Sequence, residues 1–315
     1  MKPLLIVNPA SGGGRVEKDF HRIERETMRS LGPCDIAWTD RKGHAIQIAR
    51  DAALSQREIV IAVGGDGLLH EVVNGLMLAR ERQGLNTRLG VIAQGTGGDF
   101  RKSLGIDHRL TSYCEAIAKG RTRHVDVGRM RYINHKLENA EAFFVNILSV
   151  GMGGLVDQYV AESSRQFGGT LAYLAASSRA LRDSAVGVLR CEMRVDGRVQ
   201  EHVIRTRSLA ICNGQYFGSG MRVAPMAHLD DGVFEIIDLG NAPRLAFMLS
   251  NLRIYNGTHL KSSSVNHYRC DQIDLDLVNA SVADQFILDV DGEPLGRLPL
   301  RVELVPRALE VFGPT

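Results

Sequence analysis

The sequence lacks several features that would assign it to a common class of protein. Its 315 residues include five cysteines but no C-x-x-C pair, so the spacing typical of zinc sites and dithiol redox motifs is absent. The number of cysteines is odd, and a disulfide framework is therefore not expected. Isolated thiols of this kind usually serve as small hydrophobic side chains in a reducing compartment. We therefore expect a cytoplasmic protein.

Long apolar runs and a strong charge of one sign are missing as well. No stretch approaches the roughly 18 apolar residues of a membrane-spanning helix. The run Leu4 to Val7 stops at Asn8 and Pro9, which is too short for a leader peptide. With 38 Lys and Arg against 36 Asp and Glu, the net charge is only +2, which gives no reason to expect nucleic acid as a partner. A lipid substrate would have to be met by peripheral contact with the membrane surface.

Familiar nucleotide and metal signatures are also absent. There is no G-x-x-x-x-G-K-[ST] phosphate loop, and Glu17 stands where the third glycine of a G-x-G-x-x-G fingerprint belongs. His70 and Glu71 begin a zinc-protease motif, but Asn74 occupies the position of its second histidine. Any nucleotide chemistry in this chain must therefore use another design.

What the sequence does contain is a set of three glycine-rich loops, each after a strand-like run. They are Asn8 to Gly14, the GGDG loop Gly64 to Gly67, and Gly95 to Phe100. Glycine lets backbone N–H groups approach a phosphate closely, and the N-terminus of a following helix adds partial positive charge. Three such loops at consecutive strand ends predict a nucleotide-binding site.

Two of these loops also carry an aspartate, Asp66 and Asp99. A carboxylate repels a phosphate unless a cation lies between or near them. The pairing therefore indicates a metal-loaded nucleotide, most simply Mg²⁺ with ATP, and a phosphoryl-transfer enzyme.

Two domains are expected from the order of the predicted elements. Residues 1–125 alternate strands and helices, which predicts a nucleotide-binding α/β domain with a parallel sheet and ligands at the strand ends. Residues 126–315 are rich in strands, which predicts an antiparallel, sandwich-like second domain. Whether the last strand of the chain returns to the first domain stays open. The second-domain strands are expected at Phe143 to Leu148, Gly187 to Val195, Val199 to Ile211, Val233 to Leu239, Phe286 to Val290 and Leu300 to Val305, and helices at Thr170 to Arg182 and Arg244 to Tyr255.

The order and spacing of five motifs resemble the diacylglycerol kinase catalytic-domain family, which includes bacterial lipid kinases and the sphingosine and ceramide kinases. The motifs are NPASGGG at residues 8–14, GGDGLLHEVVNGL at 64–76, GTGGDF at 95–100, the segment 213–236 and DVDGEPLG at 289–296. The resemblance covers nearly the whole chain. It implies an NAD kinase/diacylglycerol kinase-like first domain and an ATP- and Mg²⁺-dependent kinase of lipid metabolism and phospholipid biosynthesis, with diacylglycerol as the default acceptor.

The resemblance also implies site residues. Family members bind ATP between the two domains, and a second-domain Mg²⁺ site uses one carboxylate, here Asp231, with the backbone carbonyls of His228 and Val233. Two positions depart from the family pattern, because Leu68 replaces a threonine and Gly98 an asparagine. The implied nucleotide-binding residues are Asn8, Pro9, Ser11, Gly12, Thr39, Gly64, Gly65, Asp66, Gly67, Leu68, Glu71, Gly95, Thr96 and Asp99.

The segment Asp291-Gly292-Glu293 matches the catalytic acidic motif of the family. A positioned carboxylate that takes the proton from an acceptor hydroxyl typically contributes about 10²- to 10⁴-fold in rate. We favour Glu293 as this base and Asp291 as a ligand of the metal–water network, although the reverse assignment stays open. Two other functions also stay open: an NAD kinase-like enzyme with a soluble acceptor, and a weakly active nucleotide- or lipid-sensing module. The sequence does not decide whether the protein is a homodimer.

Overall fold

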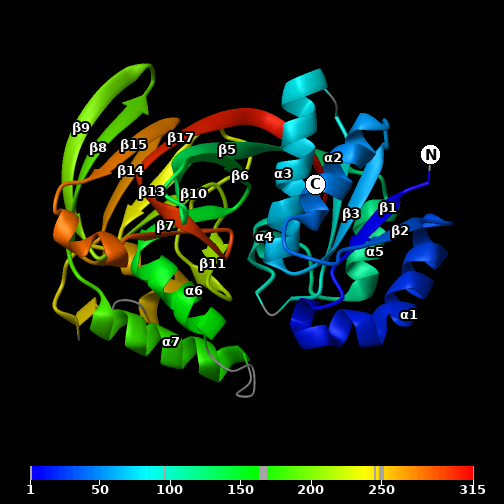
Figure 1. Ribbon diagram of the computed structural model, residues 1–315, viewed down its shortest axis with the longest axis horizontal. Helices are drawn as coiled ribbons and strands as arrows, with labels where there is room; N and C mark the ends of the chain where they lie inside the picture. The colour runs from blue at the N-terminus through cyan, green and yellow to red at the C-terminus, as the bar shows by residue number, and fades with distance from the viewer. Residues whose placement is uncertain are drawn as a thin grey trace. The chain divides into compact units, whose positions relative to one another are not determined.

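The computed structural model describes residues 2–84, 86–95, 97–162, 169–244, 246–247 and 252–314, without the side chains of 157, 161, 162 and 169–174. The chain forms two compact units (Figure 1). The first comprises Met1–Val127 with Pro306–Thr315, and the second comprises Gly128–Val305. Each unit is described by itself.

The first unit is built on a parallel sheet in which the carboxyl ends of the strands lie along one edge. The strand order is β2, β1, β3, β4 and the last part of β17. Val7 lies beside both Trp38 and Val63, and Gly64 lies beside Ala93, so the carboxyl ends of the strands form one edge of the sheet. The strands are β1 Leu4–Val7, β2 Asp35–Trp38, β3 Ile59–Gly64, β4 Arg88–Ala93 and β17 Glu293–Phe312.

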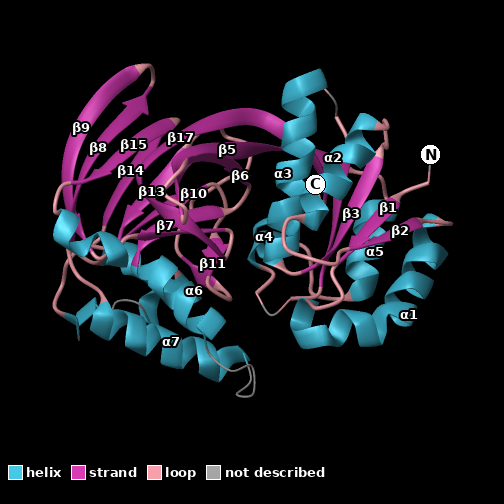
Figure 2. Ribbon diagram, in the orientation of Figure 1, coloured by secondary structure: helices cyan, strands magenta, loops and turns pink. Residues whose placement is uncertain are grey.

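Helices connect these strands and cover the sheet (Figure 2). Helix α1 packs on α5, and α2 packs on α3. In α1 the side chains of Val16, Phe20, Ile23 and Thr27 are buried, and this spacing of three to four residues is that of an amphipathic helix. The helices are α1 Ser11–Leu31, α2 His44–Leu54, α3 Asp66–Gln83, α4 Asp99–Ser103 and α5 Leu110–Ala118.

Two strands join the units covalently. Strand β5, Thr122–Asn134, begins in the first unit and ends in the second, and β17 returns. In the first unit the N–H of Arg307 donates to the carboxylate of Asp126 at 2.6 Å, and Val311 lies beside Leu89 of β4 in parallel register. The C-terminal residues thus complete the first sheet.

The second unit is a sandwich of mainly antiparallel strands. One layer follows the order β14, β13, β10, β7 and β16, and the other contains β17, β15, β8 and β9, with β5 and β6 also paired. These strands are β6 Asn139–Phe144, β7 Ile147–Gly151, β8 Gly187–Val195, β9 Arg198–Thr206, β10 Ser208–Cys212, β13 Phe234–Asp238, β14 Asn266–Cys270, β15 Gln272–Leu277 and β16 Ile287–Val290; β11 Tyr216–Phe217 and β12 Met221–Arg222 form a separate pair.

The central strands of the second unit are buried on both faces. In β10, Leu209 and Ile211 enter the core between the two layers, whereas Ala210 and Cys212 face a second hydrophobic cluster. Alternate side chains of a strand point to opposite faces, so a strand covered on both sides is hydrophobic throughout. Helices α6 Met152–Glu162 and α7 Gly169–Asp183 pack on each other, and three short 3₁₀ helices complete the unit: η1 Arg253–Asn256, η2 Thr258–Lys261 and η3 Ala280–Gln285.

The predicted fold class, an α/β domain with parallel strands and an antiparallel sandwich, is confirmed, but two predicted strands are wrong in extent. The run Phe143 to Leu148 is divided between β6 and β7, and the run Val199 to Ile211 is divided between β9 and β10. At the second break the backbone of Arg207 bonds outside both strands, donating to Gly240 and accepting from Met152. The predicted helix Arg244 to Tyr255 falls partly outside the described residues, and its described end is η1.

Strand β17 also exceeds its predicted length, because the expected run Leu300 to Val305 is only the middle of a strand of 20 residues.

Gly75 of α3 is needed for the close packing of α2 on α3. A Cβ atom at this position would lie 2.4 Å from the carbonyl oxygen of Ile46 and 2.8 Å from the Cβ of Ala49. Replacing glycine by alanine inside a helix normally stabilises it by about 1 kcal/mol. Here we expect Gly75→Ala to destabilise the protein by about 1 to 3 kcal/mol, because the added methyl group overpacks the contact.

Urea denaturation measures this change, with the exposed Gln83→Ala in the same helix as the control. A Gly75→Ala variant that is more stable than the wild type would contradict the close contact between the two helices.

Candidate active site

The first glycine loop exposes its backbone at the end of β1. The side-chain oxygen of Asn8 accepts the N–H of Ala10 at 3.0 Å, which fixes the turn. Gly12, Gly13 and Gly14 all have positive φ, and a Cβ on Gly12 would lie 2.7 Å from the carbonyl oxygen of Gln94. Only glycine adopts this path without strain. Around Gly13 and Gly14 a Cβ would meet nothing within 4 Å, so no other group crowds this part of the loop, and the N–H of Gly14 donates to the carbonyl of Ala10 at 3.1 Å.

The three glycine loops contact one another directly. The hydroxyl oxygen of Ser11 accepts the N–H of Gly65 at 3.2 Å, which joins the first loop to the second. A Cβ on Gly95 would lie 2.7 Å from the Cα of Gly65, which joins the second loop to the third. The structure thus brings together the loops expected to bind a nucleotide. Thr96 lies outside the described residues.

The carboxylates of Asp66 and Asp99 both lie close to Gly97. One oxygen of Asp66 accepts the N–H of Gly98 at 2.8 Å. A Cβ on Gly97 would lie 2.6 Å from that oxygen and 3.8 Å from an oxygen of Asp99. Hard oxygen ligands of this kind suit Mg²⁺. The residues present therefore fit a magnesium ion held beside the glycine loops.

Asp99 has a cationic partner that the sequence analysis missed. Its side chain is nearly buried and pairs with the ammonium group of Lys102 at 2.7 Å. The two residues are three positions apart on helix α4, where side chains are neighbours, so the spacing alone could have revealed the pair. Lys102 neutralises Asp99 and leaves Asp66 as the more accessible carboxylate of the two loops.

A second missed group lies in the same unit, where His108 contacts the hydroxyl of buried Tyr113 at 2.7 Å through Nδ1. Burial raises the pKa of Tyr113 to about 12, with opposing effects of Arg101 and Asp66. Burial, Arg101 and Lys102 all lower the pKa of His108. The hydroxyl therefore stays protonated, and the hydrogen bond joins it to Nδ1 of the imidazole. No local motif marks this pair.

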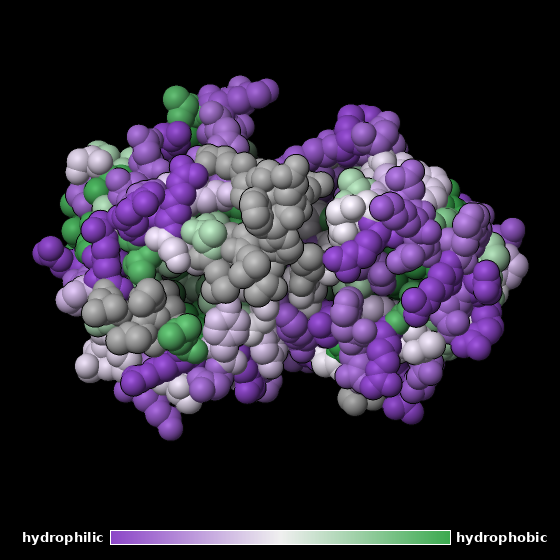
Figure 3. All heavy atoms as spheres, turned by 90° about the horizontal axis from the view of Figure 1, so that it is seen from below, coloured by the Kyte–Doolittle hydropathy of each residue, from purple (hydrophilic) through white to green (hydrophobic). Residues whose placement is uncertain are grey.

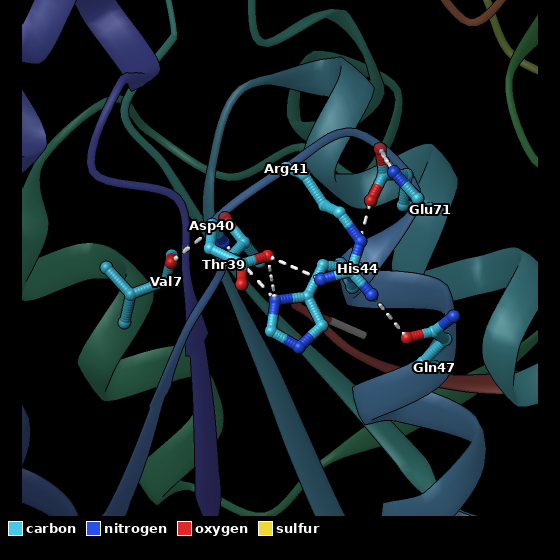
Figure 4. Close-up of polar contacts among 9 residues, drawn as sticks. Val7, Thr39, Asp40, Arg41, His44, Gln47 and Glu71 are labelled. Carbon is cyan, nitrogen blue, oxygen red and sulfur yellow. Dashed lines mark hydrogen bonds and ion pairs between the residues drawn. The ribbon is translucent and has the colours of Figure 1, made fainter.

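Glu71 and Thr39 organise the turn between β2 and α2 (Figure 4). The carboxylate of Glu71 accepts the N–H groups of Gly43 at 2.7 Å and of Ala45 at 3.1 Å. A negative charge at the N-terminus of α2 is favourable, because the helix dipole is positive there. Thr39 is buried, and its N–H donates to the carbonyl of Val7 at 2.9 Å. The geometry gives Glu71 a positioning role for this turn.

Leu68, the departure from the family pattern, is a core residue of the first unit. Its side chain is 4% exposed, and a Cβ on Gly64 would lie 2.6 Å from its Cδ2 atom. The side chain therefore supports the GGDG loop by packing and offers no hydroxyl to a phosphate. At Gly98, the other departure, φ is +58°, a conformation that asparagine also tolerates.

In the second unit, Asp291 is bound by three backbone N–H groups. Its buried carboxylate accepts from Val145 at 3.1 Å, Asn146 at 3.1 Å and Ile147 at 3.0 Å. These donors belong to the turn that divides β6 from β7, which explains why the predicted strand is interrupted there. A carboxylate held in this way fixes the turn before Glu293. Asp291 is thus engaged by backbone donors, and the assignment of Glu293 as the base stays a prediction.

A second set of polar contacts holds the same hairpin. The carboxylate of Asp289 accepts the N–H of Gly292 at 3.0 Å and the hydroxyl of Ser149 at 3.3 Å. The side chain of Asn213 donates to the carbonyl of Val145 at 2.7 Å. The motif segments 213–236 and 289–296 are thereby linked through the turn between β6 and β7.

At the proposed metal site of the second unit, Asp231 already contacts a cation. One oxygen accepts the N–H of Val233 at 3.3 Å, and the other lies 3.2 Å from the guanidinium of Arg269. Arg269 also pairs with the buried Glu235 at 3.2 Å, and Glu235 contacts His267. Burial raises the pKa of Asp231, against the lowering effects of the Val233 N–H and Arg269. No group of three His, Cys, Asp or Glu side chains suited to a metal occurs among the described residues.

A metal at Asp231, His228 and Val233 therefore stays a prediction, and the arrangement of Arg269 does not favour it. The guanidinium supplies the positive charge that an ion would bring, so a divalent cation would have to displace it.

Two family descriptions match the chain. Residues 2–130 match the diacylglycerol kinase catalytic domain, and residues 146–313, over half of the chain, match the YegS C-terminal NAD kinase beta sandwich-like domain. The chain belongs to the diacylglycerol kinase family. It is therefore an enzyme of the lipid kinase class, and the resemblance seen in its sequence motifs is confirmed.

Curated members of the diacylglycerol kinase family match along nearly their full length. The diacylglycerol kinase of Bacillus subtilis strain 168 is 26% identical over 311 residues, which cover 98% of this chain and 95% of the relative. The diacylglycerol kinase of Staphylococcus carnosus strain TM300 is 27% identical over 319 residues, covering 98% and 94%. The matches thus span the residues of both units of this chain.

Solved structures show the same fold. A protein of Bacillus anthracis strain Sterne superposes with a TM-score of 0.75 at 23% identity, covering 99% of this chain and 97% of that chain. A diacylglycerol kinase from the same strain superposes with a TM-score of 0.70 at 20% identity and the same coverage. At these identities the likeness shows the family fold alone.

Replacing Asp291 by asparagine separates structural from catalytic carboxylates in this kinase. An amide offers one acceptor oxygen and an NH₂ group, so at least one buried N–H loses its partner, which costs about 1 to 3 kcal/mol. We expect Asp291→Asn to lower the free energy of unfolding in urea by that amount. Glu293→Gln serves as the comparison and should change stability by no more than about 0.5 kcal/mol. Equal stability of the two variants would contradict the role given to Asp291.

Replacing Arg269 by glutamine tests whether the guanidinium of Arg269 or a metal ion neutralises Asp231. Without the guanidinium, Asp231 and the buried Glu235 lose their positive partner, so we expect the melting temperature to fall in the presence of EDTA. Added Mg²⁺ should then raise the melting temperature of Arg269→Gln more than that of the wild type. An equal Mg²⁺ response in both proteins would show that Arg269 does not compete with a metal there.

Proposed function

We propose that the first unit binds ATP with Mg²⁺ and that the enzyme transfers the γ-phosphate to a hydroxyl of a lipid such as diacylglycerol. The observation that carries this proposal is the convergence of three open glycine loops with the carboxylates of Asp66 and Asp99 beside Gly97. The loops offer N–H donors to phosphate oxygens, and the carboxylates would repel a triphosphate without a cation.

The roles of the first unit follow from this geometry. The backbones of Gly12 and Gly13 orient the phosphates, while Ser11 holds the first two loops together by accepting the N–H of Gly65. Asp66 would hold the magnesium ion, which neutralises charge on the phosphates when bound, while Asp99 lies beside it and is paired with Lys102. Thr39, Glu71 and the turn that they fix contribute the remaining wall of the nucleotide site.

Glu293 is proposed as the general base. Its carboxylate takes the proton of the acceptor hydroxyl, the hydroxyl oxygen forms a bond to the γ-phosphorus, and the bond from phosphorus to the β,γ-bridging oxygen breaks, so that ADP leaves. Asp289 and Asp291 do not take part in proton transfer. They fix the turn on which Glu293 stands through their bonds to Gly292 and to residues 145–147.

The acceptor is proposed to be reached at a membrane surface. No helix in the described part of the chain is long and apolar enough to cross a bilayer. On the face shown in Figure 3, hydrophilic residues dominate the described surface, and hydrophobic residues occur among them in small groups. Diacylglycerol is named as the acceptor because the curated relatives carry the name diacylglycerol kinase.

Substitutions of Asp66 and Glu293 test these assignments. We expect Asp66→Asn and Glu293→Gln each to reduce ATP-dependent phosphorylation of diacylglycerol in mixed micelles by on the order of 10²-fold or more, because the cation ligand or the base is lost. Melting temperatures should stay near that of the wild type, which separates loss of chemistry from loss of fold.

Asp196→Asn and Glu201→Gln are matched controls for these two changes. Asp196 precedes a glycine at an exposed hairpin turn, and Glu201 is exposed on β9. Both control variants should retain wild-type activity. Full activity of Asp66→Asn or of Glu293→Gln would remove that residue from the proposed mechanism.

A further inference from the structure

Trp38 stands at the edge of the sheet where the glycine loops begin. It is the single tryptophan of the chain and the last residue of β2. In the parallel register it lies beside Val7, the residue before Asn8 of the first glycine loop. Thr39, which follows it, is already part of the proposed nucleotide site. The indole is therefore at the end of the sheet to which the phosphates are assigned.

The indole is held in place but remains accessible. Its centroid lies 4.4 Å from that of Phe20, with an angle of 58° between the ring planes. Phe20 is 8% exposed and belongs to α1, the helix that begins with the glycines, whereas Trp38 is 41% exposed. Phe20 thus fixes the position of the indole from one side, so that a ligand would find a rigid aromatic surface.

Exposure alone does not make a binding site, because single apolar side chains occur on every protein surface. The argument rests on what the nucleotide still requires. The three loops offer N–H donors and carboxylates, which suit a triphosphate and its cation, but none of the residues assigned to the nucleotide is aromatic. A purine base requires a flat apolar surface, and stacking on an aromatic side chain is the usual way to provide one.

We propose that Trp38 is a nucleotide-binding residue whose indole stacks on the adenine base of ATP. This inference rests on the proposed function, because it assigns the base of the same nucleotide. It makes Trp38 a determinant of affinity and of preference for a purine, whereas the loops bind any triphosphate.

The test compares binding of Mg²⁺-ATP to three variants by isothermal titration calorimetry. Trp38→Leu keeps an apolar contact with Phe20 but removes the aromatic face, and we expect its dissociation constant to rise about tenfold. Trp38→Phe keeps an aromatic face and should stay within about threefold of the wild type. Met28→Ala, on α1, is the control, because Met28 is also 41% exposed and lies at the other end of the helix; it should bind as the wild type does.

Titration with tripolyphosphate and Mg²⁺ serves as a comparison, because this ligand has the phosphates of ATP but no adenine. Its affinity should be the same for the wild type and Trp38→Leu, since no ring is present to stack. The emission of the single tryptophan provides a direct signal, because ATP should change it strongly and tripolyphosphate should change it little.

The outcomes separate this inference from the proposed function. If the wild type binds ATP in the calorimeter but Trp38→Leu binds it equally well, the stacking role is wrong and the assignment of ATP stands. An equal loss of ATP and tripolyphosphate binding in Trp38→Leu would also contradict stacking. If the wild type binds no ATP, the proposed function and this inference both fail.

Discussion

The hydrogen bond from the N–H of Gly98 to the carboxylate of Asp66 is the contact on which the proposed nucleotide site depends. It joins the GGDG loop to the third glycine loop, where the carboxylates of Asp66 and Asp99 both lie close to Gly97. A charge-assisted hydrogen bond of this kind is stronger than a neutral one. The same contact places negative charge beside the loops proposed to bind a triphosphate, which is why the proposal includes a cation.

A second carboxylate is used in a similar way in the other unit. Asp291 accepts three backbone N–H groups from the turn between β6 and β7, and so fixes the hairpin that carries Glu293. In both units the carboxylate of an aspartate accepts hydrogen bonds from backbone N–H groups and thereby fixes the conformation of the backbone around it. In the proposed mechanism the chemistry is left to neighbouring groups, which are a magnesium ion at Asp66 and the carboxylate of Glu293 after Asp291. The acidic motif of this chain therefore contains two structural carboxylates, Asp289 and Asp291, beside the proposed base Glu293.

Much of the first unit could be predicted from local sequence. The geometry of the glycine loops can be predicted from their residues, because only glycine permits the positive φ of Gly12 and the close backbone contact of Gly95 with Gly65. The parallel sheet could be predicted because strands and helices alternate along residues 1–125, and strands connected by helices usually pair in parallel. The pairing of Asp99 with Lys102 was also readable from its spacing along α4.

The rest depended on contacts between residues far apart in the chain. The break between β6 and β7 is fixed by Asp291, whose carboxylate comes from a hairpin more than 140 residues later. Arg269 reaches Asp231 and Glu235 from a neighbouring strand, which no motif around Asp231 reveals. Local patterns name the residue types at a site, but the partners that neutralise or orient them are set by the tertiary fold.

The most direct test of the account is calorimetric titration of the enzyme with ATP in the presence of Mg²⁺ and again in EDTA. Because two carboxylates border the phosphate loops, we predict that Mg²⁺ tightens ATP binding by roughly tenfold or more, and that this dependence is largely lost in Asp66→Asn. If ATP binds as tightly in EDTA as in Mg²⁺, this result would contradict the central claim that a cation offsets the repulsion between these carboxylates and a triphosphate.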